Sequence, residues 1–112
     1  MLPHIKPICF NLATINRKPV KIPYQDILYL EGFSNYTLIH FLDGKYKLSP
    51  RTLLYHIRNS LDDSFIRIHR SFCVNKLYIT NKSFEENLRT TIQLENGKLL
   101  SVARRRRKVL DY

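Results

Sequence analysis

The clearest chemistry in this sequence lies in a strand-like segment that carries positive charge. Residues 65–75 alternate apolar and polar side chains as a half-buried strand does, yet they include Arg67, His69 and Arg70. Arg70 falls in the apolar row, where an unpaired guanidinium would cost several kcal/mol. We therefore expect the strand to break at about Arg70 and to turn that side chain outward, where it could meet a ligand. The other positions divide into an apolar row of Ile66, Ile68, Phe72 and Val74 and a polar row of Arg67, His69, Ser71 and Asn75.

The densest charge in the chain is a basic run near its end, formed by Arg104, Arg105, Arg106, Arg107 and Lys108. Arginine can bind a phosphate through two parallel hydrogen bonds, so the simplest use of this run is contact with phosphate groups. Four consecutive arginines on a helix spread over about 300°, so one ligand surface can use only two or three of them. Arg104 and Arg105 directly follow a predicted strand and are the best positioned. A solvated tail or a membrane-surface patch is the alternative use of this run.

Composition points to an anionic partner. The chain has 112 residues, with 19 Lys and Arg against 9 Asp and Glu, which gives a formal charge of +10. This balance is typical of nucleic-acid binders, and the length suits one domain. No apolar run approaches the roughly 20 residues of a membrane-spanning helix, and the start of the chain does not have the pattern of a signal peptide. We therefore expect a cytoplasmic protein that does not bind membranes.

The loop at residues 31–36 is a second candidate for contact with nucleic acid. It includes Ser34 and Asn35 and lies between two predicted strands. An asparagine side chain can form two hydrogen bonds with an adenine edge in the major groove. By itself this signal is weak, because an asparagine between strands is more often a turn former.

Catalysis is not favoured by the pattern of reactive residues. The histidines His4, His40, His56 and His69 lie on four separate predicted elements, and none has metal-ligand spacing with another. Neither a glycine-rich phosphate loop nor a nucleophile elbow is present. Cys9 and Cys73 have no paired spacing and are expected to be small packed residues. We expect a protein that is not an enzyme and needs neither cofactor nor metal.

Most of the chain is predicted to form short strands, because β-branched and aromatic residues recur in short runs between turn residues. Early strands are expected at residues 8–15, 20–22 and 27–30. Asp43-Gly44 and Asn96-Gly97 suit two-residue type I′ hairpin turns. Such turns would place Phe41 opposite Tyr46, Ile39 opposite Leu48, and Leu94 opposite Leu99.

One amphipathic helix is expected over about residues 50–61. Ser49 can cap it, Pro50 suits its first turn, and apolar residues recur at helical spacing at Leu53, Leu54, Ile57 and Leu61. His56 and Arg58 lie off that apolar stripe, so we expect both to face solvent. A second short basic helix or turn is expected after Ala103, running towards Leu110.

Taken together, these motifs resemble the LytTR DNA-binding domain over about residues 5–112. The specific part is the pattern Phe65-x-Arg67-x-His69-Arg70-Ser71-x-x-Val74-Asn75. Weaker matches, in the right order, are Asp26-Ile27-Leu28-Tyr29-Leu30-Glu31, Ser34-Asn35-Tyr36, the two hairpin dipeptides, and Ser101-Val102 before the arginines. One departure is Ala103, which stands where the family usually has a serine that could contact phosphate.

The resemblance implies an elongated, mainly all-β fold of short antiparallel sheets with one small helix. It also implies loops at one edge that enter successive major grooves of DNA. The family's contact positions carry over to Ser34 and Asn35, to the turn that follows the histidine, and to the start of the basic run. With the neighbouring polar and basic candidates included, the predicted DNA-binding residues are Ser34, Asn35, His69, Arg70, Ser71, Asn75, Lys76, Arg104, Arg105, Arg107 and Lys108. Asn75 could instead hold the turn.

The function that this resemblance implies is sequence-specific binding of double-stranded DNA by a bacterial transcription regulator, as the output domain of a LytR/AgrA-type response regulator. Expected targets are paired direct repeats, with two copies of the domain on one DNA face. This chain shows no acidic cluster of a phosphoacceptor receiver domain, so we expect it to stand alone or to be a piece of a longer regulator. The alternative is a non-catalytic basic β module that binds RNA or single strands. It would use Tyr29, Tyr36, Tyr46 and Tyr55 as a stacking platform, although their alternation with apolar residues favours packing.

Overall fold

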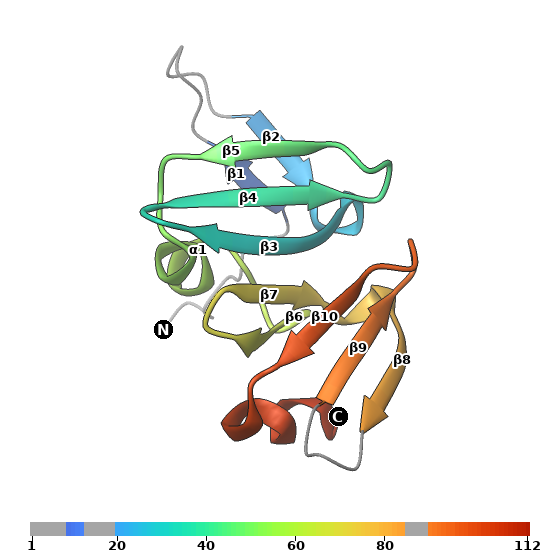
Figure 1. Cartoon of the computed structure of the whole chain (residues 1–112). Coiled ribbons are helices and arrows are strands. Elements are labelled where there is room, and N and C mark those ends of the chain that lie inside the picture. The colour runs from blue at the N-terminus through green and yellow to red at the C-terminus, as the bar shows by residue number, and fades with distance from the viewer. Residues whose placement is uncertain (1–8, 13–19, 85–89) are drawn as a thin grey trace, which may run out of the picture.

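The protein, described by a computed structural model for residues 9–12, 20–84 and 90–112, is built mainly from short antiparallel strands (Figure 1). The central sheet has the strand order β5-β4-β3-β7-β6 and consists of β3 (Ile27–Phe33), β4 (Tyr36–Phe41), β5 (Tyr46–Ser49), β6 (Phe65–His69) and β7 (Phe72–Asn75). A second sheet has the order β10-β9-β8 and consists of β8 (Ile79–Phe84), β9 (Thr90–Leu94) and β10 (Leu99–Val102). A two-stranded sheet pairs β1 (Cys9–Leu12) with β2 (Val20–Pro23).

The helices are short. The α-helix α1 spans Leu53–Asn59, and a 3-10 helix, η3 (Arg104–Leu110), follows β10. Two single-turn 3-10 helices, η1 (Tyr24–Asp26) and η2 (Lys76–Tyr78), join strands. Within the described ranges, no helix is long and apolar enough to cross a membrane.

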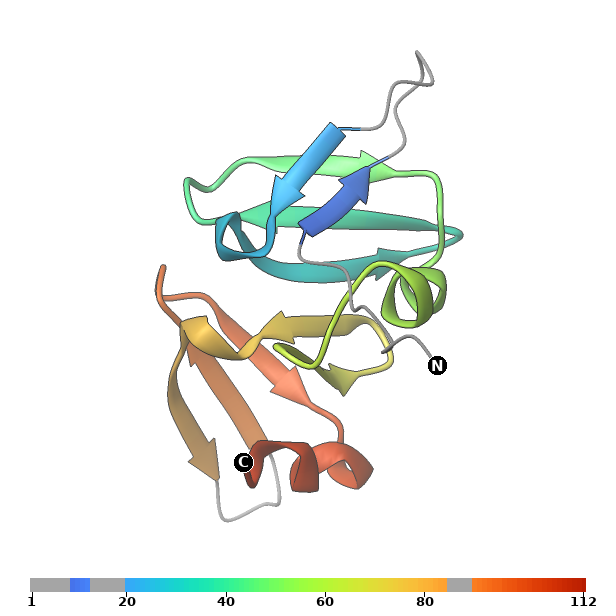
Figure 2. The ribbon, with the colours of Figure 1, turned by 180° about the vertical axis from the view of Figure 1, so that it is seen from behind.

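The central sheet is packed on both faces. One face meets the β1–β2 hairpin and α1, seen from behind in Figure 2, around a core that includes Phe10, Ile39 and Leu53. The other face, over β6 and β7, meets the second sheet around a core that includes Ile68, Val74 and Ile92. The extents of 47 × 38 × 24 Å make the molecule about twice as long as it is thick. The expected elongated, mainly β fold is therefore confirmed.

The predicted break at Arg70 is also confirmed, in the form of a hairpin. Strand β6 ends at His69, Arg70 is exposed in the turn, and β7 begins at Phe72. The apolar row of Ile66, Ile68, Phe72 and Val74 packs in the second core, as expected, and the opposite face of the hairpin is covered as well. The second core contains Ile68 and the first contains Phe65.

The two glycine hairpins close with three-residue loops, so the predicted type I′ turns and registers were wrong. In the first, the Phe41 amide donates to the Lys45 carbonyl at 2.9 Å, Gly44 has a φ of 86°, and Asp43 Oδ1 accepts from the Lys45 amide at 2.9 Å. A type I′ turn needs positive φ at both central residues, and Asp43 does not have it. The extra loop residue shifts the pairing by one, to His40 with Tyr46 and Leu38 with Leu48.

The second hairpin repeats this design. The Leu94 amide donates to the Lys98 carbonyl at 2.9 Å, Gly97 has a φ of 86°, and Asn96 Oδ1 accepts from the Lys98 amide at 3.0 Å. Leu99 consequently pairs with Gln93 and not with Leu94.

The predicted helix is real but shorter, and its cap was misassigned. Thr52 is the N-cap residue, and its hydroxyl accepts from the Tyr55 amide at 3.1 Å. Ser49 is buried and hydrogen bonded to His56 at 2.7 Å. The expectation that His56 faces solvent was therefore wrong. The strand expected at residues 8–15 is observed as Cys9–Leu12, and its other positions lie outside the described residues. The expected C-terminal helix is of the 3-10 type.

Candidate nucleic-acid interface

The β3–β4 turn presents Ser34 and Asn35 to solvent. Phe33 pairs with Tyr36, which leaves these two residues as the tip of a tight hairpin. Ser34 has a φ of 55°, a left-handed conformation that is costly for a residue with a Cβ atom. Neither side chain forms a hydrogen bond with the described residues. Both therefore remain available to a ligand.

The β6–β7 turn presents Arg70, with Ser71 half-buried beside it. Its conformation is held from within, because Arg67 Nη2 donates to the Arg70 carbonyl at 2.8 Å and the Ser71 amide donates to His69 Nδ1 at 3.1 Å. Since Nδ1 accepts, the neutral His69 ring carries its proton on Nε2. His69 thus positions the turn through Nδ1, and its Nε2–H group can still donate a hydrogen bond to a ligand.

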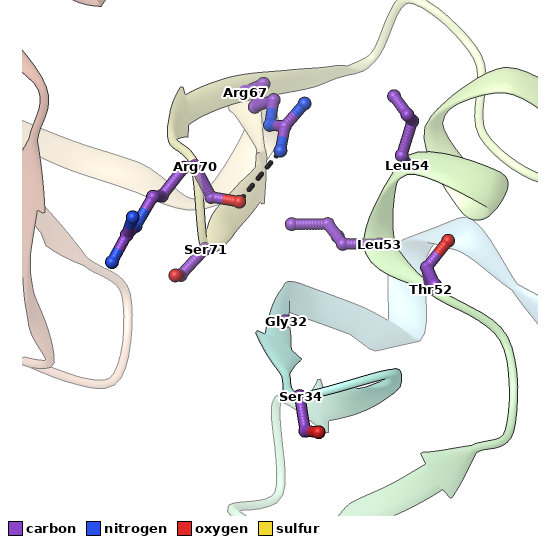
Figure 3. A pocket seen from close by; sticks show the side chains of 8 residues that line it. All are labelled: Gly32, Ser34, Thr52, Leu53, Leu54, Arg67, Arg70 and Ser71. Atoms are coloured by element: carbon purple, nitrogen blue, oxygen red, sulfur yellow. Dashed lines mark hydrogen bonds between the residues drawn. The ribbon is translucent and has the colours of Figure 1, made fainter.

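Backbone pairing joins the two turns. The Gly32 amide donates to the Ser71 carbonyl at 2.8 Å, just beyond the regular pairing of β3 with β7. Ser34, Arg70 and Ser71 consequently line one shallow pocket, together with residues of α1 (Figure 3). In this view the Arg70 guanidinium points away from the other lining residues.

The basic helix η3 lies along the free edge of β6. The Ala103 amide donates to the Ile68 carbonyl at 2.8 Å, and Leu110 anchors the other end of η3 in the core. Arg104, Arg105 and Lys108 are exposed. The β3–β4 turn, the β6–β7 turn and the start of η3 therefore follow one edge, at the left in Figure 1 and at the right in Figure 2. We call Ser34, Asn35, His69, Arg70, Ser71, Arg104 and Arg105 the arginine edge.

Three predicted contact residues do not join this edge in the expected way. Asn75 is 2% exposed, and its amide donates to the carbonyls of Tyr24 and Ile27 at 3.1 and 3.0 Å while accepting from the Leu77 amide at 3.1 Å. Its assignment to DNA contact is therefore corrected: the amide holds η1, β3 and η2 together.

Lys76 and Arg107 are also poorly placed. Lys76 follows β7 at the end opposite to the Arg70 turn, and its ammonium group lies 5.2 Å from the centre of the Tyr112 ring. Arg107 is half-buried, and its Nε and one terminal nitrogen are buried with no hydrogen-bond partner in the described part of the chain. Neither Lys76 nor Arg107 belongs to the arginine edge.

The sequence prediction missed two residues that border the edge. Arg67 and Thr52 line the pocket between the turns. Arg67 belongs to the polar row and to the family pattern, but neither residue is among the predicted DNA-binding residues. The signal for Arg67 was its charge in a segment that was otherwise suited to a strand. Thr52 gave no signal, because Ser49 was expected to cap the helix and Pro50 to lie in its first turn.

The arginine edge carries positive charge that no acidic side chain of the described residues neutralises through an ion pair. Elsewhere in the described part of the chain, His40 and Glu31 form an ion pair at 2.9 Å. None of the arginines on the edge takes part in an ion pair there. Such a surface attracts polyanions over a range set by ionic strength.

The cysteines contribute no reactive group to the edge. Cys9 and Cys73 are free thiols, half-buried and buried. Burial raises the pKa of Cys73 to about 12, which keeps its thiol protonated and unreactive.

Short antiparallel sheets that expose basic turns along one edge suit a nucleic-acid-binding domain, because such a surface attracts a polyanion. Residues 17–111 match the family model described as the LytTr DNA-binding domain, and the chain belongs to this family. Its function is DNA binding.

A solved structure agrees with this assignment. The fold is similar to the LytTr DNA-binding domain of a Bacillus cereus protein described as a methyl-accepting/DNA response regulator. The TM-score is 0.77 at 23% identity, and the match covers 96% of this chain and 100% of the other. No curated protein matches this sequence.

Proposed function

We propose that the protein binds double-stranded DNA sequence-selectively, with the arginine edge entering successive major grooves. The observation that carries this proposal is the placement of three segments, distant in sequence, along one edge where their donors are free. Arg70 is suited to a guanine edge and Asn35 to an adenine edge. Arg104, Arg105 and Lys108 would neutralise phosphates and fix the position of the domain on the duplex.

The wider setting is part of the same proposal. The domain would act in the bacterial cytoplasm as the output part of a response regulator, with a receiver domain elsewhere in the regulator. Paired direct repeats would bring two copies onto one face of the DNA. The matched Bacillus cereus domain belongs to a protein described as a response regulator, which supports this setting.

Selection of binding sites from random duplexes tests the proposal. We expect enrichment of one short motif, and replacement of Arg70 by Ala should then weaken binding to that motif by about 1–3 kcal/mol and relax preference at one base pair. The control is Lys98→Ala, which removes one exposed positive charge at the opposite edge. Equal weakening by Arg70→Ala on all sequences would show that Arg70 contacts phosphate and not a base.

A second candidate is binding of single strands. Phe33, Tyr36 and Tyr46 are 63%, 46% and 63% exposed, and the pairing of β3, β4 and β5 places them on one sheet face. Tyr29, a candidate for such a platform, is 4% exposed and belongs to the core, which is the packing that its alternation with apolar residues favours. Comparing duplex DNA, single-stranded DNA and RNA over one salt series separates the two candidates, because stacking on aromatic rings requires unpaired bases.

A further inference from the structure

The pocket between the two turns has the chemistry of an anion site. It has a volume of about 350 Å³ and is lined by Gly32, Ser34, Thr52, Leu53, Leu54, Arg67, Arg70 and Ser71 (Figure 3). Its two charged side chains are arginines, Arg67 and Arg70. Its other polar side chains are the hydroxyls of Ser34, Thr52 and Ser71. Every polar side chain on its wall can therefore donate a hydrogen bond, and no carboxylate lies among them.

Arg67 is the central group of this pocket. It is half-buried, and one terminal nitrogen donates to the Arg70 carbonyl at 2.8 Å. Its Nε is buried and has no hydrogen-bond partner among the described residues, and no carboxylate there is seen to pair with it. A buried donor without a partner is costly, so this guanidinium has unused capacity to bind an anion.

A second guanidinium increases that capacity. Burial, and then the positive charge of Arg106 on η3, lower the pKa of Arg67. Arg106 is half-buried next to the β6 edge, where η3 is fixed by the bond from Ala103 to Ile68. Two like charges held together on a rigid scaffold repel each other in the free protein, and an anion would remove that repulsion.

Resting on the proposed function, we infer that this pocket holds one phosphodiester group of the bound DNA backbone, with Arg67 as its main ligand. The hydroxyls of Ser34 and Ser71 form no hydrogen bond with the described residues and would donate to the same group. The Thr52 hydroxyl already accepts from the Tyr55 amide, and its own proton is free to donate. The phosphate would be clamped between the two turns whose tips, Asn35 and Arg70, face the bases.

The first experiment compares Arg67→Gln with Lys98→Gln, two variants of equal net charge. Arg67→Gln should bind about tenfold more weakly to a selected duplex and to a scrambled duplex, because a charge-assisted bond to the backbone is lost. The slope of log affinity against log salt should fall by about one. Lys98→Gln should change neither quantity by as much. Equal effects of the two variants would overturn the inference.

The second experiment replaces each backbone phosphate in turn by an uncharged methylphosphonate. At one position, the methylphosphonate should weaken binding by the wild-type protein about tenfold and leave binding by Arg67→Gln unchanged, because both changes remove the same contact. Ser71→Ala should show a smaller, roughly threefold loss that disappears at that same position. If the penalty of Arg67→Gln persists at every position, Arg67 does not hold a backbone phosphate.

Three further readings make the result decisive. Hydrogen exchange shows whether Arg67→Gln retains the β6–β7 hairpin; if it does not, Ser71→Ala carries the methylphosphonate test. Saturable binding of inorganic phosphate at the pocket, with no responsive backbone position, would assign the site to a free anion and overturn the inference. Failure of the wild-type protein to prefer any sequence would contradict the proposed function alone, since the pocket is tested equally on scrambled duplexes.

Discussion

The two opposite edges of the molecule are both made of turns, but their polar side chains are used differently. On the edge opposite to the arginine edge, the loops Leu42 to Gly44 and Glu95 to Gly97 place glycine at the positive φ angle and use Asp43 or Asn96 to bind their own backbone. We call these two loops the glycine edge. It is further tied to η1, because the Leu42 amide donates to the Asp26 carbonyl at 3.2 Å.

The arginine edge differs from the glycine edge in both respects. Its positive φ falls on Ser34, and the side chains at its two tips form no hydrogen bond with the described part of the chain. Glycine would be the easier residue at such a position, and an asparagine that binds its own turn would be the more stable choice. The difference indicates that the glycine edge is selected for folding and the arginine edge for contact with a ligand.

The largest expected effect tests whether internal and edge asparagines are truly different. Asn75→Ala should lower the free energy of unfolding by about 3–4 kcal/mol, because three backbone groups lose their partner inside the protein. Asn35→Ala, the matched change at the arginine edge, should lower it by less than about 0.5 kcal/mol. Urea unfolding measures both. Similar losses for the two variants would contradict the distinction.

The next largest effect is a pH dependence of protein stability, which arises from a buried histidine and not from either edge. His56 lies between the hydroxyls of Ser49 and Ser60, at 2.7 and 2.9 Å, and packs on Phe10. Burial, and then the charge of Arg51, lower the pKa of His56 from 6.5 to about 4. The folded state therefore favours the neutral ring.

The sign of the effect follows from this shift. Below pH 6.5 the unfolded chain takes up the proton first, so the contribution of His56 to stability is complete above about pH 6.5 and is lost as the pH falls towards 4. The loss is at most about 3 kcal/mol. Urea unfolding across this range, with an NMR titration of the His56 ring, measures it. A ring that titrates near pH 6.5 in the folded protein would show that burial does not act as argued.

The smallest expected effects come from substitutions at the positions of positive φ on the two edges. Gly44→Ala should destabilise the protein by about 1 kcal/mol because of its φ of 86°, and Gly97→Ala, at the same angle, should do the same. Ser34→Gly should stabilise it by about 0.5 kcal/mol, since the left-handed strain is removed. Thermal unfolding measures all three. A destabilising Ser34→Gly would mean that the serine side chain contributes to the turn.

The sequence predicted the fold class and the location of the turns well, for a physical reason. Alternation and turn dipeptides are local signals, and they were enough to place the hairpins. Register was missed because Asp-Gly and Asn-Gly also suit a three-residue loop, and one extra residue moves every pair. His56 was missed because its partner Ser49 comes before the helix, where a helical pattern cannot show it.

The site was predicted in the same partial way. The misfit of Arg70 in its strand correctly located an outward turn. Alternation placed Asn75 in the polar row but could not show that it is buried, since its burial depends on the carbonyls and amides that surround it and not on the local pattern. Arg67 was undervalued because its neighbour Arg106 is far along the chain and approaches only through the free edge of β6.

The hydrogen bond from the Gly32 amide to the Ser71 carbonyl has a consequence for target choice. It fixes the spacing of the two turn tips by backbone geometry. Under the proposed function, substitution of Asn35 or Arg70 would therefore change which bases are accepted. It would not change the distance between the two contacted positions on the DNA, which only a rebuilt sheet could alter.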